Sequence, residues 1–238
     1  MKYILTVASA GLFLLSGCQK EKIRQDNAAD GSLRISIISS GMNYGITTES
    51  ETNIHTLDAY HFENGILSKS FNSLQIDEKG VCRLDIKQKN GMLYFLANDA
   101  NITSRANLTN NVTTLEEFLQ LTATADEMTS KSLLMSGHTE LDGENASLSV
   151  SLKRTVARID LESAFQDAEV NSITIRDIAL IGLVNEGGNK SVLTNIEKTD
   201  LTKDFGEQPF KNKKESLYYL PEQTSNGHEV EIMMTANG

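Results

Sequence analysis

The sequence predicts a mostly β protein with two tandem antiparallel β-sandwich domains and one short helix, the second domain being short or truncated. Short segments alternate apolar and polar residues with the period of a half-buried strand. Glycine-containing turn signals (ENG, EKG and KNG) separate several of these segments, and only one segment has helical spacing. We place the N-terminal domain at residues 32–165 and the C-terminal domain at residues 171–238.

The N-terminus, MKYILTVASAGLFLLSG, has the layout of a secretory signal peptide over residues 1–17. Its apolar run is shorter than the roughly 20 residues that a membrane-spanning helix needs. The following LSGC is similar to a bacterial lipobox, so we expect cleavage between Gly17 and Cys18 and acylation of the Cys18 thiol, with palmitate among the acyl groups. Residues 18–31 then form a polar tether. The alternative is an ordinary signal peptide that happens to be cut near a cysteine.

The first strand is predicted over residues 32–39, SLRISIIS, where Leu33, Ile35 and Ile37 alternate with polar residues. Two further strands should flank the turn at Glu63-Asn64-Gly65, because Asn-Gly accepts the positive φ angles of a tight hairpin. The turn signals at residues 78–80 and 89–91 lie on either side of the predicted strand VCRLDIKQ. The second turn is followed directly by the predicted strand MLYFLAND. Within the first of these, Cys82 is interpreted as a small core residue and not as a nucleophile.

The helix is predicted within TTLEEFLQLTATA, where Thr114 and Glu117 form a capping box. Its apolar face is expected at Leu115, Phe118, Leu119 and Thr122. Beyond it, ASLSVSLKRTVARIDLES is predicted to be one long strand. The buried side chains of that strand, in the core of the first domain, are expected to be Leu152, Val156 and Ile159.

The C-terminal region is expected to begin after a linker at residues 165–171 and to contain three clear strands, in SITIRDIALIGLV, SLYYLPE and EVEIMMT. The polar stretch 185–215 is expected to be a loop. A structureless loop of about 30 residues argues against a complete compact domain. The second domain is therefore either a fragment or is completed by a strand from elsewhere.

Composition excludes several classes of function. The net charge of −10 opposes binding to phosphates, so we expect no nucleic-acid partner. Once Cys18 is acylated, Cys82 is the only thiol, and no internal disulfide is possible. The four histidines (His55, His61, His138 and His228) lack ligand spacing, so we expect no metal site. Nucleophile-elbow, phosphate-loop and dinucleotide motifs are missing; we therefore expect no enzyme, no catalytic residues and no cofactor.

The order of these segments resembles the fimbrillins, the lipoprotein-derived subunits of Bacteroidales type V pili. The resemblance runs from residue 14 to about residue 222, through the lipobox, GSLRISIISSG, NIHTLDAYHFENG, GMLYFLANDAN, TTLEEFLQL, KSLLMSGHTEL, VSLKRTVARIDL and LYYLPE. It implies two tandem β-sandwich domains of the transthyretin-like pilin type. It also implies a role in pilus assembly and cell adhesion at the outer membrane, without catalysis.

Two departures from the family pattern bear on the subunit's role. In polymerising fimbrillins, a trypsin-like protease cuts after an arginine just beyond the first strand, and a strand of the next subunit fills the groove. Here no Lys or Arg occurs between Arg34 and Lys69, and the C-terminal region is short. Both departures favour a lipid-anchored anchor or minor subunit over a stalk pilin.

The resemblance also implies partners. These are other fimbrial subunits through β-strand addition, the outer membrane through the lipid, and a host or bacterial surface receptor; Leu33, Ile35 and Ile37 are the candidate strand-exchange residues. The alternative function is a surface glycan- or peptide-binding lipoprotein of a nutrient-uptake system, or a β-sandwich lipoprotein with neither role. The low aromatic content, 6% with no tryptophan, argues against an aromatic sugar platform.

Overall fold

The computed structural model describes residues 32–39, 49–87, 89–130, 132–144, 146–163, 169–188, 190–222 and 230–237. The strands of the N-terminal half are β1 (Leu33–Ser39), β2 (Leu57–Glu63), β3 (Ile66–Phe71), β4 (Val81–Leu84), β5 (Asn90–Ala97), β6 (Thr122–Thr124), β7 (Met135–Asp142) and β8 (Ser147–Arg154). They are followed by β9 (Val156–Glu162), β10 (Glu169–Ala179), β11 (Ile181–Leu183), β12 (Lys198–Asp204), β13 (Lys214–Pro221) and β14 (Glu231–Asn237). Short helices are α1 (Glu49–Thr52), α2 (Ile102–Arg105), α3 (Leu115–Leu119), α4 (Ala125–Thr129) and the 3₁₀ helix η1 (Lys190–Leu193).

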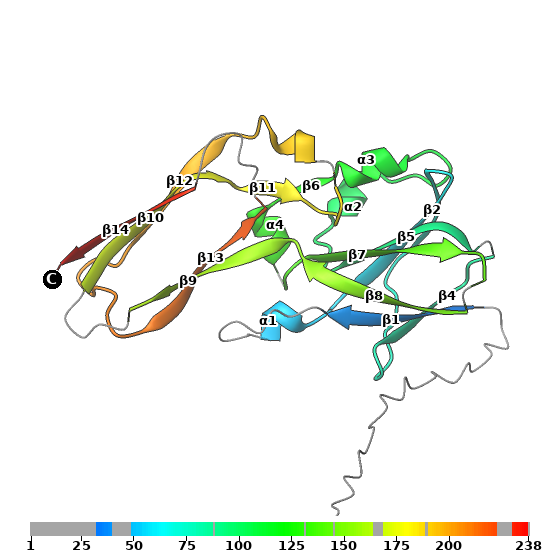
Figure 1. Ribbon diagram of the computed structural model, residues 1–238, viewed down its shortest axis with the longest axis horizontal. Helices are drawn as coiled ribbons and strands as arrows, with labels where there is room; N and C mark the ends of the chain where they lie inside the picture. The colour runs from blue at the N-terminus through cyan, green and yellow to red at the C-terminus, as the bar shows by residue number, and fades with distance from the viewer. Residues whose placement is uncertain are drawn as a thin grey trace, which may run out of the picture.

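The first sandwich is a seven-stranded sheet in the order β3-β2-β5-β7-β8-β1-β4. The β7–β8 pairing joins its two halves through only two residue pairs, so the sheet can fold over on itself. Both halves contribute to one core of buried side chains that includes Leu33, Phe95 and Leu152, each fully buried. Figure 1 shows this part on the right and the C-terminal strands on the left. The predicted mostly β, sandwich-type fold is confirmed.

The predicted hairpin is present as β2 and β3. Asn64 and Gly65 adopt the positive φ angles of 50° and 79° that the turn requires. The turn predicted at residues 89–91 is wrong in part, because Asn90 and Gly91 already pair with β7 as the start of β5. A Cβ on Gly91 would lie 2.1 Å from the Phe62 carbonyl oxygen, so this glycine allows two strands to approach closely.

The predicted helix is α3, and its N-terminus is the predicted capping box. The Thr114 side chain accepts a hydrogen bond from the Glu117 N–H, and the Glu117 side chain accepts one from the Thr114 N–H. However, the helix ends at Leu119, and Thr122 belongs to β6, which pairs with β11 of the C-terminal half. A second capping box, at Thr124 and Glu127, begins α4.

The long strand predicted over residues 146–163 is two strands in different sheets. Thr155 is a bend between β8, which pairs with β1, and β9, which pairs with β13. As a result Leu152 lies in the first core, Val156 packs beneath the short helices, and partly buried Ile159 packs in the C-terminal sandwich. The expectation that all three lie in one core was therefore wrong.

The C-terminal strands form a three-stranded sheet, β12-β10-β14, and a two-stranded ribbon, β13-β9. Buried side chains of β10 and of the ribbon share two apolar clusters, one with Ile173 and Leu161 and one with Ile175 and Leu220. The polar stretch predicted as a loop contains β12, and β10 begins inside the predicted linker. Both segments were missed because strands were predicted from alternating apolar residues, and partly exposed polar strands such as KTDLTKD lack this alternation.

Candidate functional site

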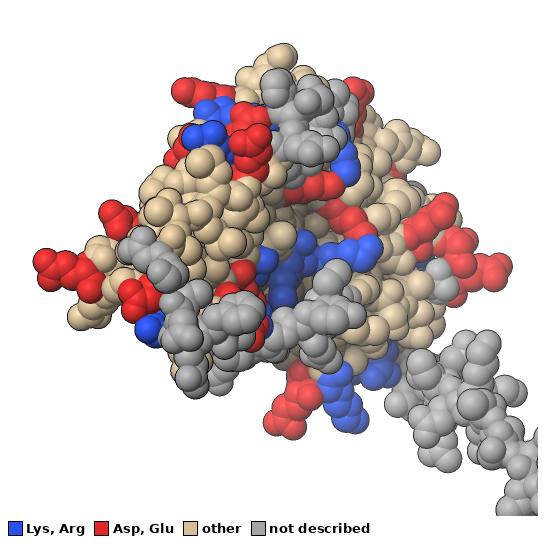
Figure 2. All heavy atoms as spheres, turned by 60° about the vertical axis from the view of Figure 1, so that its left-hand side comes forward, with Lys and Arg blue, Asp and Glu red and all other residues tan. Residues whose placement is uncertain are grey.

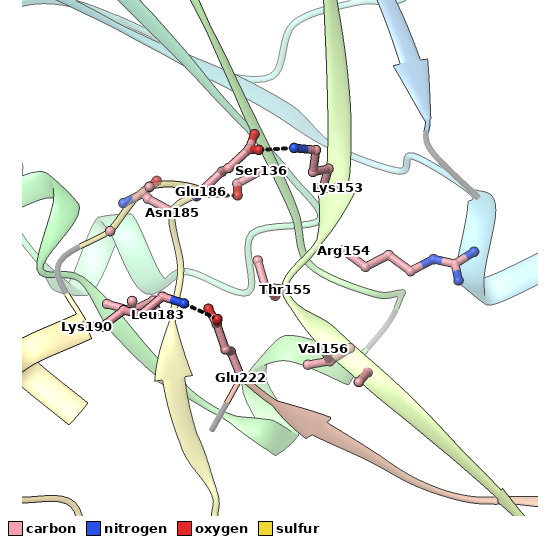
Figure 3. Close-up of a pocket in the computed structure, with 13 residues that line it drawn as sticks. Ser136, Lys153, Arg154, Thr155, Val156, Leu183, Asn185, Glu186, Lys190 and Glu222 are labelled. Atoms are coloured by element: carbon pink, nitrogen blue, oxygen red, sulfur yellow. Dashed lines mark hydrogen bonds and ion pairs between the residues drawn. The ribbon is translucent and has the colours of Figure 1, made fainter. Parts of the chain in front are cut away.

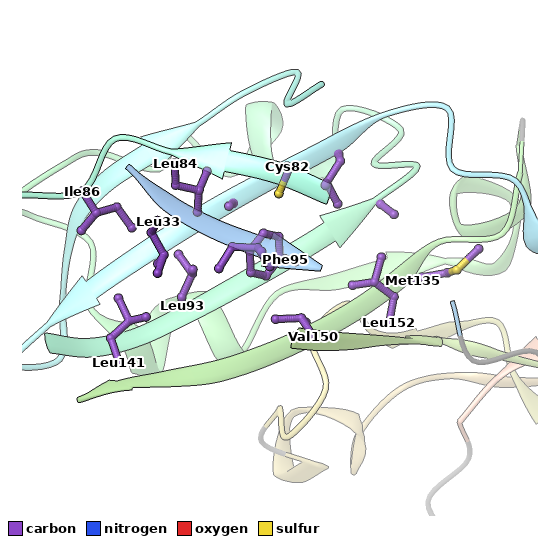
Figure 4. Close-up of a cluster of buried hydrophobic side chains, with 14 residues drawn as sticks. Leu33, Cys82, Leu84, Ile86, Leu93, Phe95, Met135, Leu141, Val150 and Leu152 are labelled. Carbon is purple, nitrogen blue, oxygen red and sulfur yellow. The ribbon is translucent and has the colours of Figure 1, made fainter. Parts of the chain in front are cut away.

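Strand β1 lies inside the first sheet, between two neighbours. It pairs antiparallel with β4 and parallel with β8, with Ile35 opposite Cys82 on one side and Leu148 on the other. The parallel pairing departs from the all-antiparallel sandwich that the sequence predicted. Figure 4 shows β1 crossing the buried cluster, with Leu33 directed into it.

The three predicted strand-exchange residues lie on the core-facing side of β1, but not equally deeply. Leu33 and Ile35 are completely buried, whereas Ile37 is only partly buried beside the same cluster. Complete burial of two such side chains contributes about 1.5–3 kcal/mol each. Removing β1 would therefore expose a groove between β8 and the edge strand β4, lined by apolar residues of both strands.

Arg34 is held within this ladder, as the sequence predicted. Its N–H donates to the Ala146 carbonyl at 3.2 Å, and the residue lies opposite Arg83 and Ser147. The expectation that residues beyond Ser39 offer no protease site falls partly on residues 40–48, which lie outside the described residues, as do Gly17 and Cys18.

Helix α1, which follows that segment, is joined to the C-terminal ribbon by a buried carboxylate. The side chain of Glu51 is 1% exposed. Its Oε1 accepts hydrogen bonds from Arg158 Nη1 at 2.7 Å and from the Tyr219 hydroxyl at 2.9 Å. Arg154 Nε donates to the Glu51 carbonyl at 3.1 Å. These contacts attach the chain just before β2 to β9 and β13.

Strand β14 is an edge strand that pairs with β10 alone among the described strands. Directly opposite residues of an antiparallel pair lie on the same face of the sheet. Ile232 and Met234 are opposite Ile175 and Ile173, which are 0% and 3% exposed and face the core. Nevertheless Ile232 and Met234 are 54% and 59% exposed. The ribbon β13-β9 thus covers β10 but leaves the same face of β14 uncovered.

The free edge of β14 lacks the usual protection against strand pairing. Edge strands commonly carry lysine, proline or an inward-pointing charge. The sequence of β14, EIMMTAN, has a single charge at its first residue and no lysine or proline. Met233, on the other face, is also 46% exposed. The strand therefore presents apolar side chains and an open row of backbone groups together.

Sequence reasoning identified β14 as a strand but missed its exposure. The available signal was the run Ile232-Met233-Met234, because three successive apolar residues place apolar side chains on both faces of a strand. A strand with one solvent face would alternate instead. In Figure 1, β14 lies at the left-hand end of the molecule, remote from β1.

The remaining chemistry-bearing side chains have structural surroundings. Burial raises the pKa of the Cys82 thiol to about 11, and the residue is 1% exposed within the first core. His61 is also buried, with Nε2 2.8 Å from the Asn90 carbonyl oxygen. Within the described ranges, no group of three or more His, Cys, Asp and Glu side chains could hold a metal ion. No helix in that part of the chain is long and apolar enough to cross a membrane.

Charge is unevenly distributed over the face turned toward the C-terminal strands. Figure 2 shows Lys and Arg side chains gathered in a central hollow, whereas Asp and Glu side chains lie mostly toward the periphery. An acidic outer surface accords with the net charge of −10. It disfavours contact with nucleic acid over most of this face.

Comparison with known proteins shows which fold this arrangement belongs to. No protein-family model and no curated protein matches the sequence. Among solved structures, a candidate cell adhesion protein from Parabacteroides distasonis aligns with a TM-score of 0.56 at 15% identity, covering 87% of this chain and 75% of that one. The tip fimbrial protein Mfa3 from Porphyromonas gingivalis, truncated at its C-terminus, aligns with a TM-score of 0.52 at 15% identity over 80% and 68% of the two chains.

The chain has the fold of Bacteroidales fimbrial proteins. A further structure with this fold, a candidate polysaccharide-binding protein from Bacteroides thetaiotaomicron, aligns with a TM-score of 0.53 at 12% identity, over 86% of this chain and 75% of that one. The fimbrial fold is thus shared by proteins described as adhesive, fimbrial and sugar-binding. The fold alone does not identify the function, so the function must be argued from the surfaces of the present chain.

Proposed function

We propose that this chain is a lipid-anchored subunit of a bacterial fimbrium that acts in pilus assembly and cell adhesion. It is an anchor or minor subunit and not a stalk pilin. The observation that carries the proposal is the uncovered inner face of β14, on a chain with the fimbrial fold. The occupant of that face is an extended strand of another fimbrial subunit.

Strand addition suits β14 because it supplies both kinds of contact that the edge lacks. An added strand forms a ladder of backbone hydrogen bonds, and its alternate side chains fill apolar positions. Here those side chains would pack beside Ile232 and Met234 on the same face of the sheet, where these residues are 54% and 59% exposed. The occupant should therefore carry apolar residues at every second position and require no cofactor.

Retention of β1 supports the anchor or minor role. Its two buried side chains and its ladders to β4 and β8 oppose release of the strand. A chain that keeps β1 also keeps the connection from its folded domain to Cys18. We infer that acyl chains on Cys18 hold the protein at the outer membrane, since two or more chains give stable anchoring. We also infer that the chain is not an enzyme, because the sequence lacks catalytic motifs.

The test is incorporation into fibres. The double variant Ile232→Lys, Met234→Lys places two charges where the added strand would pack, and both positions are exposed, so the fold should survive. Fimbriae isolated from cells expressing the variant should lack the chain when probed with an antibody against it. Val112→Lys, a charge at a 67% exposed apolar residue outside any edge strand, is the matched control and should incorporate normally. Equal incorporation of the wild-type chain, the double variant and Val112→Lys would contradict the proposal.

The alternative is a surface glycan- or peptide-binding lipoprotein of a nutrient-uptake system. One observation favours it, the fold shared with the candidate polysaccharide-binding protein from Bacteroides thetaiotaomicron. The gene neighbourhood separates the two. Adjacent genes for pilin-like lipoproteins favour a fimbrial subunit, and an adjacent outer-membrane transporter pair favours nutrient uptake.

A further inference from the structure

A cavity of about 440 Å³ lies where β8 bends into β9, between the two sandwiches. Its walls come from distant parts of the chain, namely β7, the β8–β9 bend, the loop after β11, η1 and the end of β13. Figure 3 shows this arrangement, with Thr155 between the two sides. The volume falls within the range of pockets that bind small ligands.

The loop after β11 is fixed before any ligand arrives. Asn185 Nδ2 donates to the Phe118 carbonyl at 2.6 Å, and the Glu186 N–H donates to Ser136 Oγ at 2.7 Å. Gly188 packs so closely that a Cβ there would lie 2.8 Å from the Leu119 carbonyl oxygen. The cavity wall is therefore preformed, which reduces the entropy cost of binding.

Asn185 holds this wall in place and does not itself face the ligand. The residue is 4% exposed, its Oδ1 is buried, and its Nδ2 donates to the Phe118 carbonyl. The group of this loop that a ligand can reach is the neighbouring Glu186 carboxylate, whose side chain is 26% exposed.

Two Lys–Glu ion pairs form the polar edges of the cavity. Lys153 pairs with Glu186, and Lys190 pairs with Glu222. Figure 3 shows the two pairs on opposite sides of Thr155. An ammonium group donates hydrogen bonds, a carboxylate accepts them, and a hydroxyl does both. Each pair can thus bind neighbouring hydroxyl groups, one accepting from lysine and one donating to glutamate.

The charge balance selects a neutral ligand. Both lysines are already neutralised by carboxylates, and an anion would have to displace one of them. The third cation, Arg154, points away from the other lining residues and donates to the Glu51 carbonyl. Val156 and Leu183 line the floor of the cavity, and because they are only 9% and 7% exposed they offer a small apolar area to a ligand.

We propose that this cavity binds a neutral sugar residue. Glu186 and Glu222 accept its hydroxyl hydrogens, Lys153 and Lys190 donate to its hydroxyl oxygens, and Val156 and Leu183 lie beneath its apolar face. The cavity binds a single sugar residue, so it does not require a platform of aromatic side chains for a longer glycan. It is independent of strand addition at β14, and it is compatible with either candidate function.

The experiment is a titration of the ¹⁵N-labelled mature chain, without its acyl groups, followed by NMR. The probes are D-glucose, D-galactose, D-mannose and N-acetyl-D-glucosamine, with inorganic phosphate as the anionic competitor. At least one sugar should shift the amide signals of residues 183–188 and of Ser136. Glu186→Gln should weaken that binding about tenfold, as expected for loss of a hydrogen bond to a charged group.

The control is Glu215→Gln, which removes a carboxylate from an exposed ion pair with Lys213 outside the cavity. It should leave sugar binding unchanged. A methyl glycoside that binds as well as the free sugar assigns the site to glycan chain ends, whereas loss of binding on methylation assigns it to free sugars. The proposal is overturned if no sugar shifts these signals, if phosphate alone does, or if Glu215→Gln weakens binding as much as Glu186→Gln.

Discussion

Arg158 contacts carboxylates from two different parts of the chain. Its Nη1 is 2.7 Å from Glu51 Oε1, and its Nε is 2.8 Å from Asp160 Oδ1. Burial opposes the charge of Arg158, but hydrogen bonds to the two carboxylates raise its pKa above the ordinary value. Likewise, burial tends to raise the pKa of Asp160, yet hydrogen bonds from Ser216 and Arg158 lower it overall. The ionised forms of Arg158 and Asp160 are therefore stabilised by hydrogen bonds that exist only in the folded chain.

The depressed pKa of Asp160 predicts a dependence of stability on pH. A carboxyl whose pKa is lower in the folded state stabilises the protein above its unfolded pKa, near 3.8, and loses that contribution as the pH falls through the folded value. The melting temperature should therefore exceed that of Asp160→Asn at pH 7, and the difference should shrink below pH 3.8. Thermal unfolding followed by circular dichroism measures both. A difference that is constant with pH would show that the ionised form of Asp160 is not stabilising.

Val156 tests the packing beneath the short helices. It is 9% exposed and belongs to the cluster that contains Phe118 and Met128. Val156→Asp places a carboxylate without a partner among apolar side chains, and we expect a loss of several kcal/mol in the free energy of unfolding. Urea denaturation measures this loss. An unchanged unfolding midpoint would contradict the buried position of the side chain.

Cys18 tests the lipid anchor. Cys18→Ala removes the only thiol available for acylation at the predicted cleavage site. The variant should leave the membrane fraction, because in the proposed anchor the acyl chains on Cys18 are what hold the protein there. Fractionation of cells followed by a high-salt wash checks this. Sedimentation of the alanine variant with washed outer membranes would mean that something other than the lipid holds the protein.

At the scale of elements, β1 and β14 differ in what covers them. β1 lies between two strands with its apolar side chains mostly buried, whereas β14 has one neighbour among the described strands and exposed apolar residues on both faces. Opening of a strand with two neighbours requires the loss of two ladders, so it is rarer than opening of an edge. This difference is the reason why our proposal keeps β1 in the mature fold and places the contact with other subunits at β14.

The proposed retention of β1 predicts the mature N-terminus. Residues 35–68 contain no Lys or Arg, and Arg34 lies within the ladder. A trypsin-like protease should therefore leave β1 attached, and protein isolated from cells that make fimbriae should begin at Cys18. N-terminal mapping by mass spectrometry gives the answer. A mature N-terminus within residues 35–54 would instead place the chain among the polymerising subunits.

Local signals predicted some element boundaries well and missed others of the same kind. The capping box at Thr114 and Glu117 located the start of α3. The same signal recurs at Thr124 and Glu127, where it begins α4, but the helical spacing of Leu119 and Thr122 concealed it by suggesting one longer helix. The chain instead forms β6 between the helices, because β11 supplies a pairing partner. That partner is about 60 residues away in the sequence, so a local sequence pattern could not predict the pairing.

At the scale of the whole molecule, the two-sandwich class was predictable and the connection between the sandwiches was not. Apolar alternation continues from Leu152 to Val156, so nothing local marks the bend at Thr155 that moves β9 into the second sandwich. The buried contact of Glu51 with Arg158 also spans 107 residues. Both features depend on tertiary contacts. The run Ile232-Met233-Met234 could indicate apolar residues on both faces of β14, but its register with β10 was needed to show that the core-facing side is the uncovered one.

Photo-crosslinking from position 234 tests the central claim, that β14 receives a strand of another fimbrial subunit. A photoreactive amino acid replaces Met234 in the full chain, in cells that assemble fimbriae, and mass spectrometry identifies the products. We predict a crosslink to an extended, alternately apolar segment of another fimbrial subunit, and none from the control position Val112. Absence of such a crosslink from fibre-forming cells, or the same products from both positions, would contradict the account.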